Sequence, residues 1–236
     1  MPDFPGPAPA DIGEAYRLQR AVQAAMAEPV CGWKIGATSR TVQEAIGTRE
    51  PFYGPLYAPR CHGSGAAVPV PEGALGIECE FAFRLAKDLP PRPEPYGTDE
   101  VVEAVGSVHP AIELVGLCLP SAAFRDVRWC IADHGLDVAL IAGAGVTDWR
   151  QLDLAGLTVH AVVNGAERAA GSGAAVLGSP LVALTWLANA LSFHDRGLLA
   201  GDWISTGTCT GIQVVKPGDV ADGMFEGIGS VRVSFS

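Results

Sequence analysis

A short alternating segment, GIECEFAFRL from Gly76 to Leu85, constrains the fold of this chain more than any other stretch. Its apolar residues share one face if the segment is extended, because side chains alternate between the two faces of a β-strand. These apolar residues are Ile77, Cys79, Phe81 and Phe83. The other face begins with two glutamates, Glu78 and Glu80, among residues that favour a dry environment. The segment therefore predicts a core strand that carries two carboxylates side by side.

The composition favours a fold built mainly from strands and tight turns. The 236 residues are 48% hydrophobic, which supplies enough apolar material for a sizeable core. Only 18% of residues are charged, whereas there are 29 glycines and 18 prolines, a balance that suits a β-dominated domain. We expect an N-terminal helical and loop region over residues 1–66, packed on a catalytic β-roll domain over residues 67–236.

Four segments are predicted to be helical, from their apolar spacing and from a suitable N-cap residue at the start of each. Their ranges, counted from the N-cap, are 11–28, 39–47, 98–106 and 179–191, with caps Asp11, Ser39, Thr98 and Ser179. Asn164 and Gly165 stand between two alternating segments and predict a type I′ β-hairpin. Residues 51–65 are rich in glycine and proline and are predicted to form a loop.

The net charge and the spacing of the cysteines argue against several classes of protein. A formal net charge of −10 argues against nucleic acid or an anionic membrane as a partner. The six cysteines include no Cys-x-x-Cys pair, so they predict neither a zinc site nor a disulfide framework, and isolated thiols are usually inert core residues. The N-terminus has no signal-peptide pattern, and the longest apolar run, residues 136–146, is too short to span a bilayer. We expect a reduced, cytoplasmic protein.

The two glutamates of the alternating segment suggest a metal site. Glu78 and Glu80 point to the same face of a strand, roughly 7 Å apart along the chain. Together in an apolar setting they would repel each other, and a hard divalent cation such as Mg²⁺ would relieve that cost. A third carboxylate, Glu113, lies alone in the apolar segment PAIELVG. The alternative is a solvent-facing edge strand with ordinary surface glutamates.

Three further polar residues are candidates for acid–base chemistry. Lys34 stands alone in the apolar segment CGWKIGATS, where an amine near a metal would act as a general acid or base. The alternative is a side chain that reaches solvent, which is common for an isolated lysine. Asp133 and His134 are adjacent in IADHG, and the alternative for them is a polar pair in a water-facing loop.

Two glycine-containing segments offer backbone N–H groups to an anion, although such segments mostly only turn the chain. They are GSG at residues 171–173 and STGTCTG at residues 205–211, with Ser172 and Thr206 as candidate substrate-binding residues. There is no G-x-S-x-G motif and no G-x-G-x-x-G that opens a helix after a strand. The serine-hydrolase and nicotinamide interpretations therefore lack their motifs.

Taken in order, these segments resemble the fumarylacetoacetate hydrolase superfamily, and within it the 2-keto-4-pentenoate hydratase branch with its 4-oxalocrotonate decarboxylase relatives. The resemblance runs from about Ala15 to Phe235. It is carried by the order of the segments and not by any single one. The matching segments are EAYRLQ, GWKIGATS, IECEFAF, PAIELVG, VVNGAERAAGSGAAVLGSPLVALTWLANAL, GLLAGDWISTGT and GIGSVRVSF.

The resemblance implies an α+β fold with a mixed β-roll or pseudo-barrel core, peripheral helices and assembly as a homo-oligomer. It implies Mg²⁺ or Mn²⁺ held by Glu78, Glu80 and Glu113, with Lys34 beside the substrate. In such enzymes a 2-oxo acid chelates the metal, which stabilises the enolate that forms. Lys34 would then move the proton while water adds to the conjugated alkene. The predicted function is a hydratase acting on a 2-hydroxydienoate.

The resemblance is incomplete where protons are handled. Hydratases typically have Asp-Phe-Gly where this chain has Phe52, Tyr53 and Gly54. They typically have Ala-Asp-Asn-Ala-Ser where this chain has residues 132–136, so His134 stands in place of the asparagine. An arginine that often follows the third glutamate is not matched. Three alternatives stay open: a decarboxylase, a C–C hydrolase of an acylpyruvate with His134 as the water-activating base, and a homologue that binds metal and oxo acid without turnover.

Overall fold

A seven-stranded mixed sheet forms the centre of the fold in this computed structural model, which describes residues 4–236. The strands follow the order β2-β1-β10-β5-β6-β7-β3. The pairs β1–β10 and β3–β7 are parallel, and the other neighbours are antiparallel. The strands are β1 (Val30–Gly36), β2 (Phe52–Tyr57), β3 (Cys61–Gly63), β5 (Ala74–Leu85), β6 (Val105–Gly116), β7 (Asp137–Ala142) and β10 (Trp203–Thr208).

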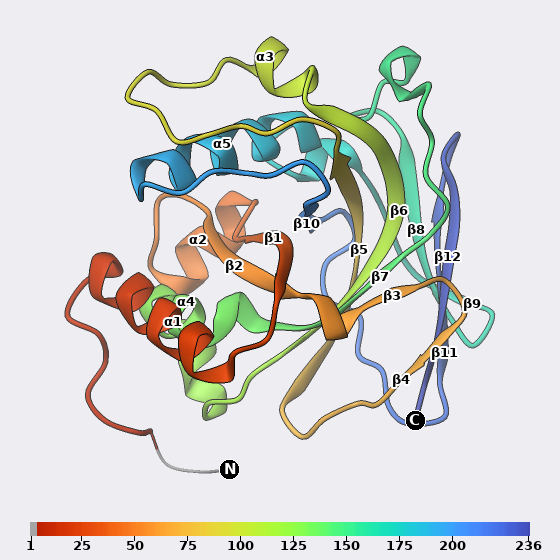
Figure 1. Ribbon diagram of the computed structural model, residues 1–236. Helices are drawn as coiled ribbons and strands as arrows, with labels where there is room; N and C mark the ends of the chain where they lie inside the picture. The colour runs from red at the N-terminus through yellow and green to blue at the C-terminus, as the bar shows by residue number, and fades with distance from the viewer. Residues whose placement is uncertain (1–3) are drawn as a thin grey trace.

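The two edges of this sheet approach each other because the edge strands are consecutive in the sequence. A single 3₁₀ turn, Ala58–Arg60, connects the end of β2 to the start of β3. β2 also packs against β7, the neighbour of β3. The sheet therefore curls into a half-open barrel, and the curvature of β5 and β6 can be followed in Figure 1. We call the face that lies inside this curl the inner face.

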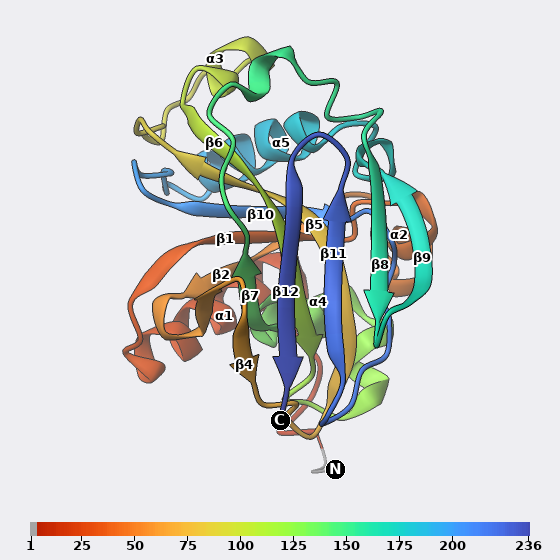
Figure 2. The same ribbon diagram turned by 90° about the vertical axis from the view of Figure 1, so that its right-hand side faces the viewer.

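A second sheet of five strands covers the outer face of β5 and β6. Its order is β4-β12-β11-β8-β9, and Figure 2 shows it in front of the larger sheet. Phe81 of β5 meets Phe225 of β11 edge to face, with ring centroids 5.1 Å apart. The strands are β4 (Ala66–Val68), β8 (Thr158–Val163), β9 (Ala166–Ser172), β11 (Val220–Phe225) and β12 (Gly229–Phe235). The predicted α+β fold with a mixed β core is confirmed.

The turn between β8 and β9 is the predicted hairpin. Asn164 has φ 54° and Gly165 has φ 77°, the left-handed pair that a type I′ turn requires. The β8–β9 hairpin is therefore explained by its two turn residues.

The helices lie at the periphery, and three of the four predicted N-caps are confirmed. The side chains of Asp11, Ser39 and Ser179 accept hydrogen bonds from backbone N–H groups in the first turn of their helices. The helices are α1 (Ile12–Met26), α2 (Arg40–Ile46), α3 (Thr98–Val102), α4 (Val127–Ala132) and α5 (Pro180–Phe193). α1 packs against α4, which also contacts β2.

The fourth predicted cap is wrong. Gly97 is the N-cap of α3, and Thr98 is the first helical residue. The Thr98 hydroxyl instead accepts a hydrogen bond of 3.3 Å from Thr185 of α5. α3 is also shorter than predicted, because β6 already begins at Val105.

The prediction that residues 51–65 form a loop is wrong as well. Phe52–Tyr57 is the fully buried strand β2, and Cys61–Gly63 is β3. β2 tolerates Pro55 because it is an edge strand, where a residue without an N–H group need not interrupt a ladder. The strands β1, β2 and β3 belong to the same sheet as β5, β6, β7 and β10, so a boundary after residue 66 cuts through that sheet.

Helix α5 belongs to the only segment of residues 4–236 that is long and apolar enough to cross a membrane, Gly173–Phe193. In the structure α5 packs its apolar side into the protein core. Leu184, Leu187 and Leu191 are fully buried there. The core accounts for the apolar character of this face of the helix.

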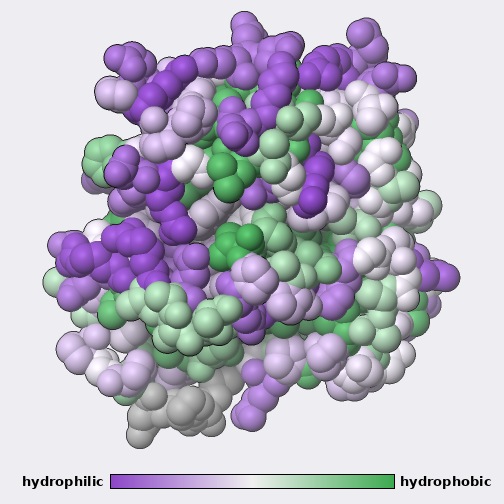
Figure 3. All heavy atoms as spheres, viewed as in Figure 1, coloured by the Kyte–Doolittle hydropathy of each residue, from purple (hydrophilic) through white to green (hydrophobic). Residues whose placement is uncertain are grey.

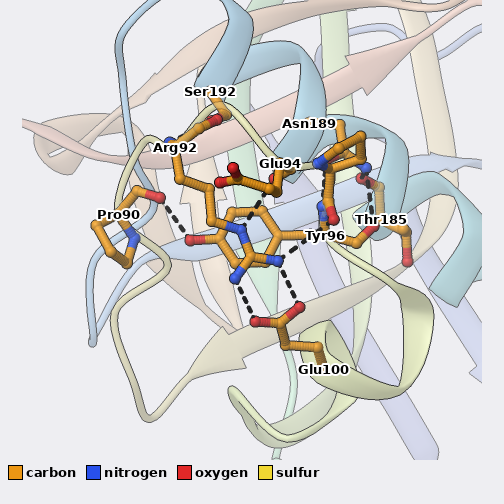
Figure 4. Close-up of polar contacts among 9 residues, drawn as sticks. Pro90, Arg92, Glu94, Tyr96, Glu100, Thr185, Asn189 and Ser192 are labelled. Carbon is orange, nitrogen blue, oxygen red and sulfur yellow. Dashed lines mark hydrogen bonds and ion pairs between the residues drawn. The ribbon is translucent and has the colours of Figure 1, made fainter.

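The proline-rich segment 88–97 is held on α5 by side-chain contacts. The Asn189 side chain accepts a hydrogen bond of 2.7 Å from the Tyr96 N–H and donates one of 3.1 Å to the Tyr96 carbonyl. The Ser192 hydroxyl accepts a hydrogen bond from the Arg92 N–H and donates one to the Arg92 carbonyl. The Arg92 guanidinium lies 3.7 Å from the Tyr96 ring centroid and pairs with Glu100, as Figure 4 shows. A segment without regular secondary structure thus covers one side of α5.

Candidate metal centre and active site

Three carboxylates converge on the inner face of the large sheet. Glu78 and Glu80 lie on the same side of β5, and Glu78 pairs in register with Glu113 of β6. One oxygen from each lies within 4.8 Å of the others. Glu80 and Glu113 are fully buried, and Glu78 is half-buried. Because β5 lies between β10 and β6, the alternative of a solvent-facing edge strand does not apply.

The triad has oxygen atoms without partners. Glu80 Oε2 accepts hydrogen bonds from Ser205 Oγ at 2.6 Å and Gly207 N at 2.7 Å. Within residues 4–236, Glu80 Oε1 and Glu113 Oε2 have no partner, and the partner of Glu113 Oε1 is the Lys34 ammonium at 3.2 Å. A buried carboxylate without partners is costly, and a divalent cation would satisfy these atoms. Carboxylate oxygens are ligands that Mg²⁺ and Mn²⁺ prefer, so the residues present fit such an ion.

Lys34 lies beside this triad. It pairs in register with Ser205 of β10, which pairs with Ala82 of β5, so its side chain is on the inner face. Its Nζ is 3.2 Å from Glu113 Oε1, and the residue is 2% exposed. The alternative of a lysine that reaches solvent therefore does not apply. Burial lowers the pKa of Lys34, but the surrounding carboxylates, Glu113 first, outweigh it and raise the pKa.

Burial also governs protonation of the carboxylates. It raises the pKa of Glu78 to about 7, with repulsion from Glu80 acting in the same direction and Lys34 opposing it. Burial raises the pKa of Glu80 and, more strongly, of Glu113, where Lys34 again opposes the rise. Without a cation, Glu78 therefore retains part of its proton at neutral pH, and binding of a metal ion would displace it.

Asp133 and His134 lie in the turn that follows α4, and both are buried. Asp133 Oδ2 accepts hydrogen bonds from Cys118 N at 2.9 Å and Leu119 N at 3.2 Å, so it holds the segment after β6. His134 Nδ1 is 2.8 Å from the Tyr57 hydroxyl. Burial lowers the pKa of His134, with Arg60 acting in the same direction, and so favours the neutral imidazole. Because both residues are buried, the alternative of a polar pair in a water-facing loop does not apply to them.

This turn lies directly on β2 and Lys34. A Cβ at Gly54 would come within 2.2 Å of the His134 carbonyl oxygen, so only glycine fits there. Gly135 has φ 72°, and a Cβ on it would lie 3.3 Å from Lys34 Cδ. Phe52 closes another side, with its ring centroid 5.9 Å from Lys34 Nζ. The ammonium group is thus enclosed by the triad, the turn and an aromatic ring.

The structure separates the two substrate-binding candidates. Ser172 is half-buried at the end of β9. Thr206 is buried, and its hydroxyl donates a hydrogen bond of 2.8 Å to the Phe81 carbonyl. Its neighbour Ser205 points to the inner face and bonds Glu80. Ser205 was missed because the sequence does not show which residue of STG faces inward.

Asp137, the first residue of β7, is a second residue that sequence reasoning missed. It pairs in register with Val115, which lies two residues beyond Glu113 on the same face of β6. It is 6% exposed, and neither carboxylate oxygen accepts a hydrogen bond within the described residues. Burial raises the pKa of Asp137 to about 7, while Lys34 opposes the rise. The signal available was a lone acid at the start of the apolar run DVALIAG.

Comparison with known proteins identifies the family. Residues 22–236 match the family described as fumarylacetoacetate (FAA) hydrolase C-terminal. The chain therefore belongs to the fumarylacetoacetate hydrolase family, as the sequence predicted.

Relatives within that family are hydratases and a decarboxylase. The chain is 32% identical to a 2-keto-4-pentenoate hydratase of Paraburkholderia xenovorans, over 95% of this chain and 84% of the relative. It is 31% identical to a 2-hydroxyhexa-2,4-dienoate hydratase of Comamonas testosteroni, over 95% and 86%. Among solved structures, 4-oxalocrotonate decarboxylase from Pseudomonas putida G7, complexed with magnesium and adipate, has a TM-score of 0.86 and 28% identity, over 96% and 86%. The predicted branch of the superfamily is confirmed.

Proposed function

We propose that this protein is a divalent-metal-dependent lyase that acts on a 2-oxo acid, with hydration of a 2-hydroxydienoate as its principal reaction. The observation that carries the proposal is the buried triad of Glu78, Glu80 and Glu113 with the Lys34 ammonium 3.2 Å from one of its oxygens. The names of the relatives support it, because two of them are hydratases of this substrate class. Mg²⁺ or Mn²⁺ is the proposed cofactor.

The triad and Lys34 have different proposed roles in the reaction. When bound to the triad, the cation supplies Lewis acidity toward the carboxylate and keto oxygens of the substrate. Lys34 holds a proton at Nζ and exchanges it with the substrate carbon skeleton during tautomerisation. Because Phe52 and the turn at His134 enclose Lys34, this proton is shielded from bulk water.

His134 is the second proposed proton handler. Its Nδ1 is occupied by Tyr57, which leaves Nε2 to exchange a proton with water or substrate. Asp133 acts as a positioning residue, since its carboxylate holds two backbone N–H groups. Ser172 remains a proposed substrate contact. Thr206 contributes through the strand that presents Ser205 to the triad.

Decarboxylation is the second candidate reaction. The structural similarity to a decarboxylase, with a TM-score of 0.86, favours it. Phe52 stands where hydratases carry Asp, and this departure is a reason to keep open the alternative of a homologue that binds without turnover. Hydration would add water across the C=C bond of the 2-oxo acid, whereas decarboxylation would break the C–C bond to a carboxylate and release CO₂.

Product identification separates these reactions. The metal-loaded protein is incubated with a 2-hydroxydienoate, a 2-oxo dicarboxylic acid of the oxalocrotonate type and an acylpyruvate. Hydration gives a hydroxylated 2-oxo acid, decarboxylation releases CO₂, and C–C hydrolysis releases a second carboxylic acid. We expect hydration to be fastest. Metal binding without turnover of any of these would contradict the enzyme assignment and favour a homologue that only binds.

We also propose that the protein is cytoplasmic and assembles as a homo-oligomer. Apolar residues gather below α5 on the face that Figure 3 shows. A cavity of about 470 Å³ lies there, lined in part by Tyr16, Tyr53 and Trp186. Phe193 at the end of α5 lines it too and is 87% exposed. A sedimentation profile that shows only monomer at micromolar concentration would contradict the proposed homo-oligomer.

A further inference from the structure

Two cysteines that are far apart in the sequence touch each other in the fold. The sulfur atoms of Cys31 in β1 and Cys61 in β3 are 3.0 Å apart, although the residues are 30 positions apart. Both side chains are half-buried. The sequence predicted isolated, inert thiols, because nothing in the spacing reveals this contact.

The pair lies where the barrel remains open. β1 is next to β2 at one end of the sheet, and β3 is the edge strand at the other end. Cys61 pairs in register with Leu140, which pairs with Glu113, so Cys61 is on the inner face. Cys31 and Cys61 pack against the same cluster, which includes Leu56 and Leu140. A bond between them would join the edge strand β3 to β1, the neighbour of the opposite edge strand.

The surroundings favour reaction at Cys31. The hydrogen bond with Cys61 lowers the pKa of Cys31, while burial and Asp137 oppose this and Arg84 adds to the lowering. The same contact raises the pKa of Cys61, which therefore remains the protonated partner. A cavity of about 440 Å³ is lined by Cys61, His109 and Trp203, so a small reagent that enters it reaches Cys61, whose sulfur touches that of Cys31.

We propose that Cys31 and Cys61 form a dithiol site that a hydroperoxide oxidises to a disulfide. The Cys31 thiolate attacks one peroxide oxygen, the O–O bond breaks, and Cys31 becomes a sulfenic acid while hydroxide leaves as water after protonation. The Cys61 sulfur then attacks the Cys31 sulfur, and the S–OH bond breaks with release of a second water. Two thiols and one hydroperoxide, here hydrogen peroxide, give one disulfide and two waters.

The disulfide would close residues 31–61 into a covalent loop that contains Lys34 and Phe52. Joining β1 to β3 removes conformational freedom from the unfolded chain, so the oxidised protein should resist thermal unfolding better than the reduced one. The site does not depend on metal or substrate. Its test is therefore independent of the proposed function.

The experiment treats fully reduced protein with one equivalent of hydrogen peroxide and blocks the remaining thiols with N-ethylmaleimide. Peptide mapping should show one cross-link between Cys31 and Cys61, with the exposed Cys118 recovered as a blocked thiol. Cys118→Ala should give the same cross-link, and Cys31→Ala should give none. Recovery of Cys31 and Cys61 as blocked thiols or as separate oxidised adducts would overturn the proposal.

Thermal unfolding supplies a second readout. The melting temperature of wild-type protein should rise on oxidation, whereas that of Cys61→Ala should be the same before and after peroxide. If the variant is poorly folded, the comparison of oxidised with reduced wild type still decides the point. A cross-linked protein that melts at or below the temperature of the reduced form would overturn the proposed closure.

Discussion

Lys34 Nζ lies 3.2 Å from Glu113 Oε1, although β10 and β5 separate their two strands in the sheet. Three strand spacings of about 4.8 Å would place the two backbones about 14 Å apart in a flat sheet. The contact therefore depends on the curl of the sheet and on two long side chains that reach across its inner face. The curl that joins β2 to β3 is what assembles the candidate site.

Lys34→Met tests the proposed acid–base group. We expect turnover to fall by at least about 100-fold, because a positioned acid–base group contributes about that much. Metal affinity, measured by calorimetry, should be retained because the three carboxylates remain. The exposed Lys87→Met is the matched control and should leave turnover unchanged. A loss of less than about threefold, roughly 0.7 kcal/mol of barrier, would show that Lys34 is not the acid or base.

Substitution of Glu113 tests the ligand set. Glu113→Gln keeps the shape of the side chain but removes the charge of a buried carboxylate whose Oε2 has no partner within residues 4–236. We expect Mg²⁺ or Mn²⁺ binding by calorimetry to weaken at least about tenfold, and chelation to lower the melting temperature of wild type but not of the variant. The exposed Glu44→Gln serves as the control. Equal metal affinity in wild type and Glu113→Gln would contradict the assignment.

The raised carboxylate pKa values predict how stability depends on pH without metal. Asp137 and Glu78 each have a pKa of about 7 in the folded protein, above the ordinary values of 3.8 and 4.5. Between these values the folded state binds more protons than the unfolded state, so the free energy of unfolding should fall as pH rises from about 4 to about 7. Asp137→Asn should make this fall shallower, as measured by urea unfolding in a chelator. A flat or rising profile would be inconsistent with the buried, unpartnered carboxylates.

His134→Asn restores the residue that hydratases carry. The imidazole contacts Tyr57 in a buried turn, so the amide can keep that hydrogen bond but cannot exchange a proton near neutral pH. If His134 handles protons, turnover should fall by about tenfold or more while metal affinity stays the same. Tyr57→Phe, which removes only the hydroxyl, should alter the pH profile of turnover. Unchanged or higher hydratase turnover in His134→Asn would show that the pocket merely tolerates His134.

Local signals explain why much of the fold was predictable. Asp11, Ser39 and Ser179 cap helices through their own side chains, and Asn164-Gly165 defines its turn. The alternation in GIECEFAFRL placed Glu78 and Glu80 together. In contrast, β2 was misjudged because its buried partners come from β1 and from the turn at His134, which no local pattern shows.

Part of the candidate site was predictable from polar residues that stand alone in apolar segments. Glu113 and Lys34 were singled out in this way, and the resemblance then implied their roles. Asp137 and Ser205 depend on register across the curled sheet, and register is a property of several strands at once. The contact between Cys31 and Cys61 depends on the same closure.

The most direct test of this account is turnover of 2-hydroxydienoate, the enol of 2-keto-4-pentenoate, by chelator-treated protein as Mg²⁺ or Mn²⁺ is added back. We expect no turnover without metal and saturable recovery in wild type, with the saturation midpoint equal to the calorimetric Kd. Glu80→Gln should need at least about tenfold more metal to reach half of its maximal rate, because one carboxylate ligand is replaced. Full turnover in the presence of excess chelator, or the same metal dependence in wild type and Glu80→Gln, would contradict the account.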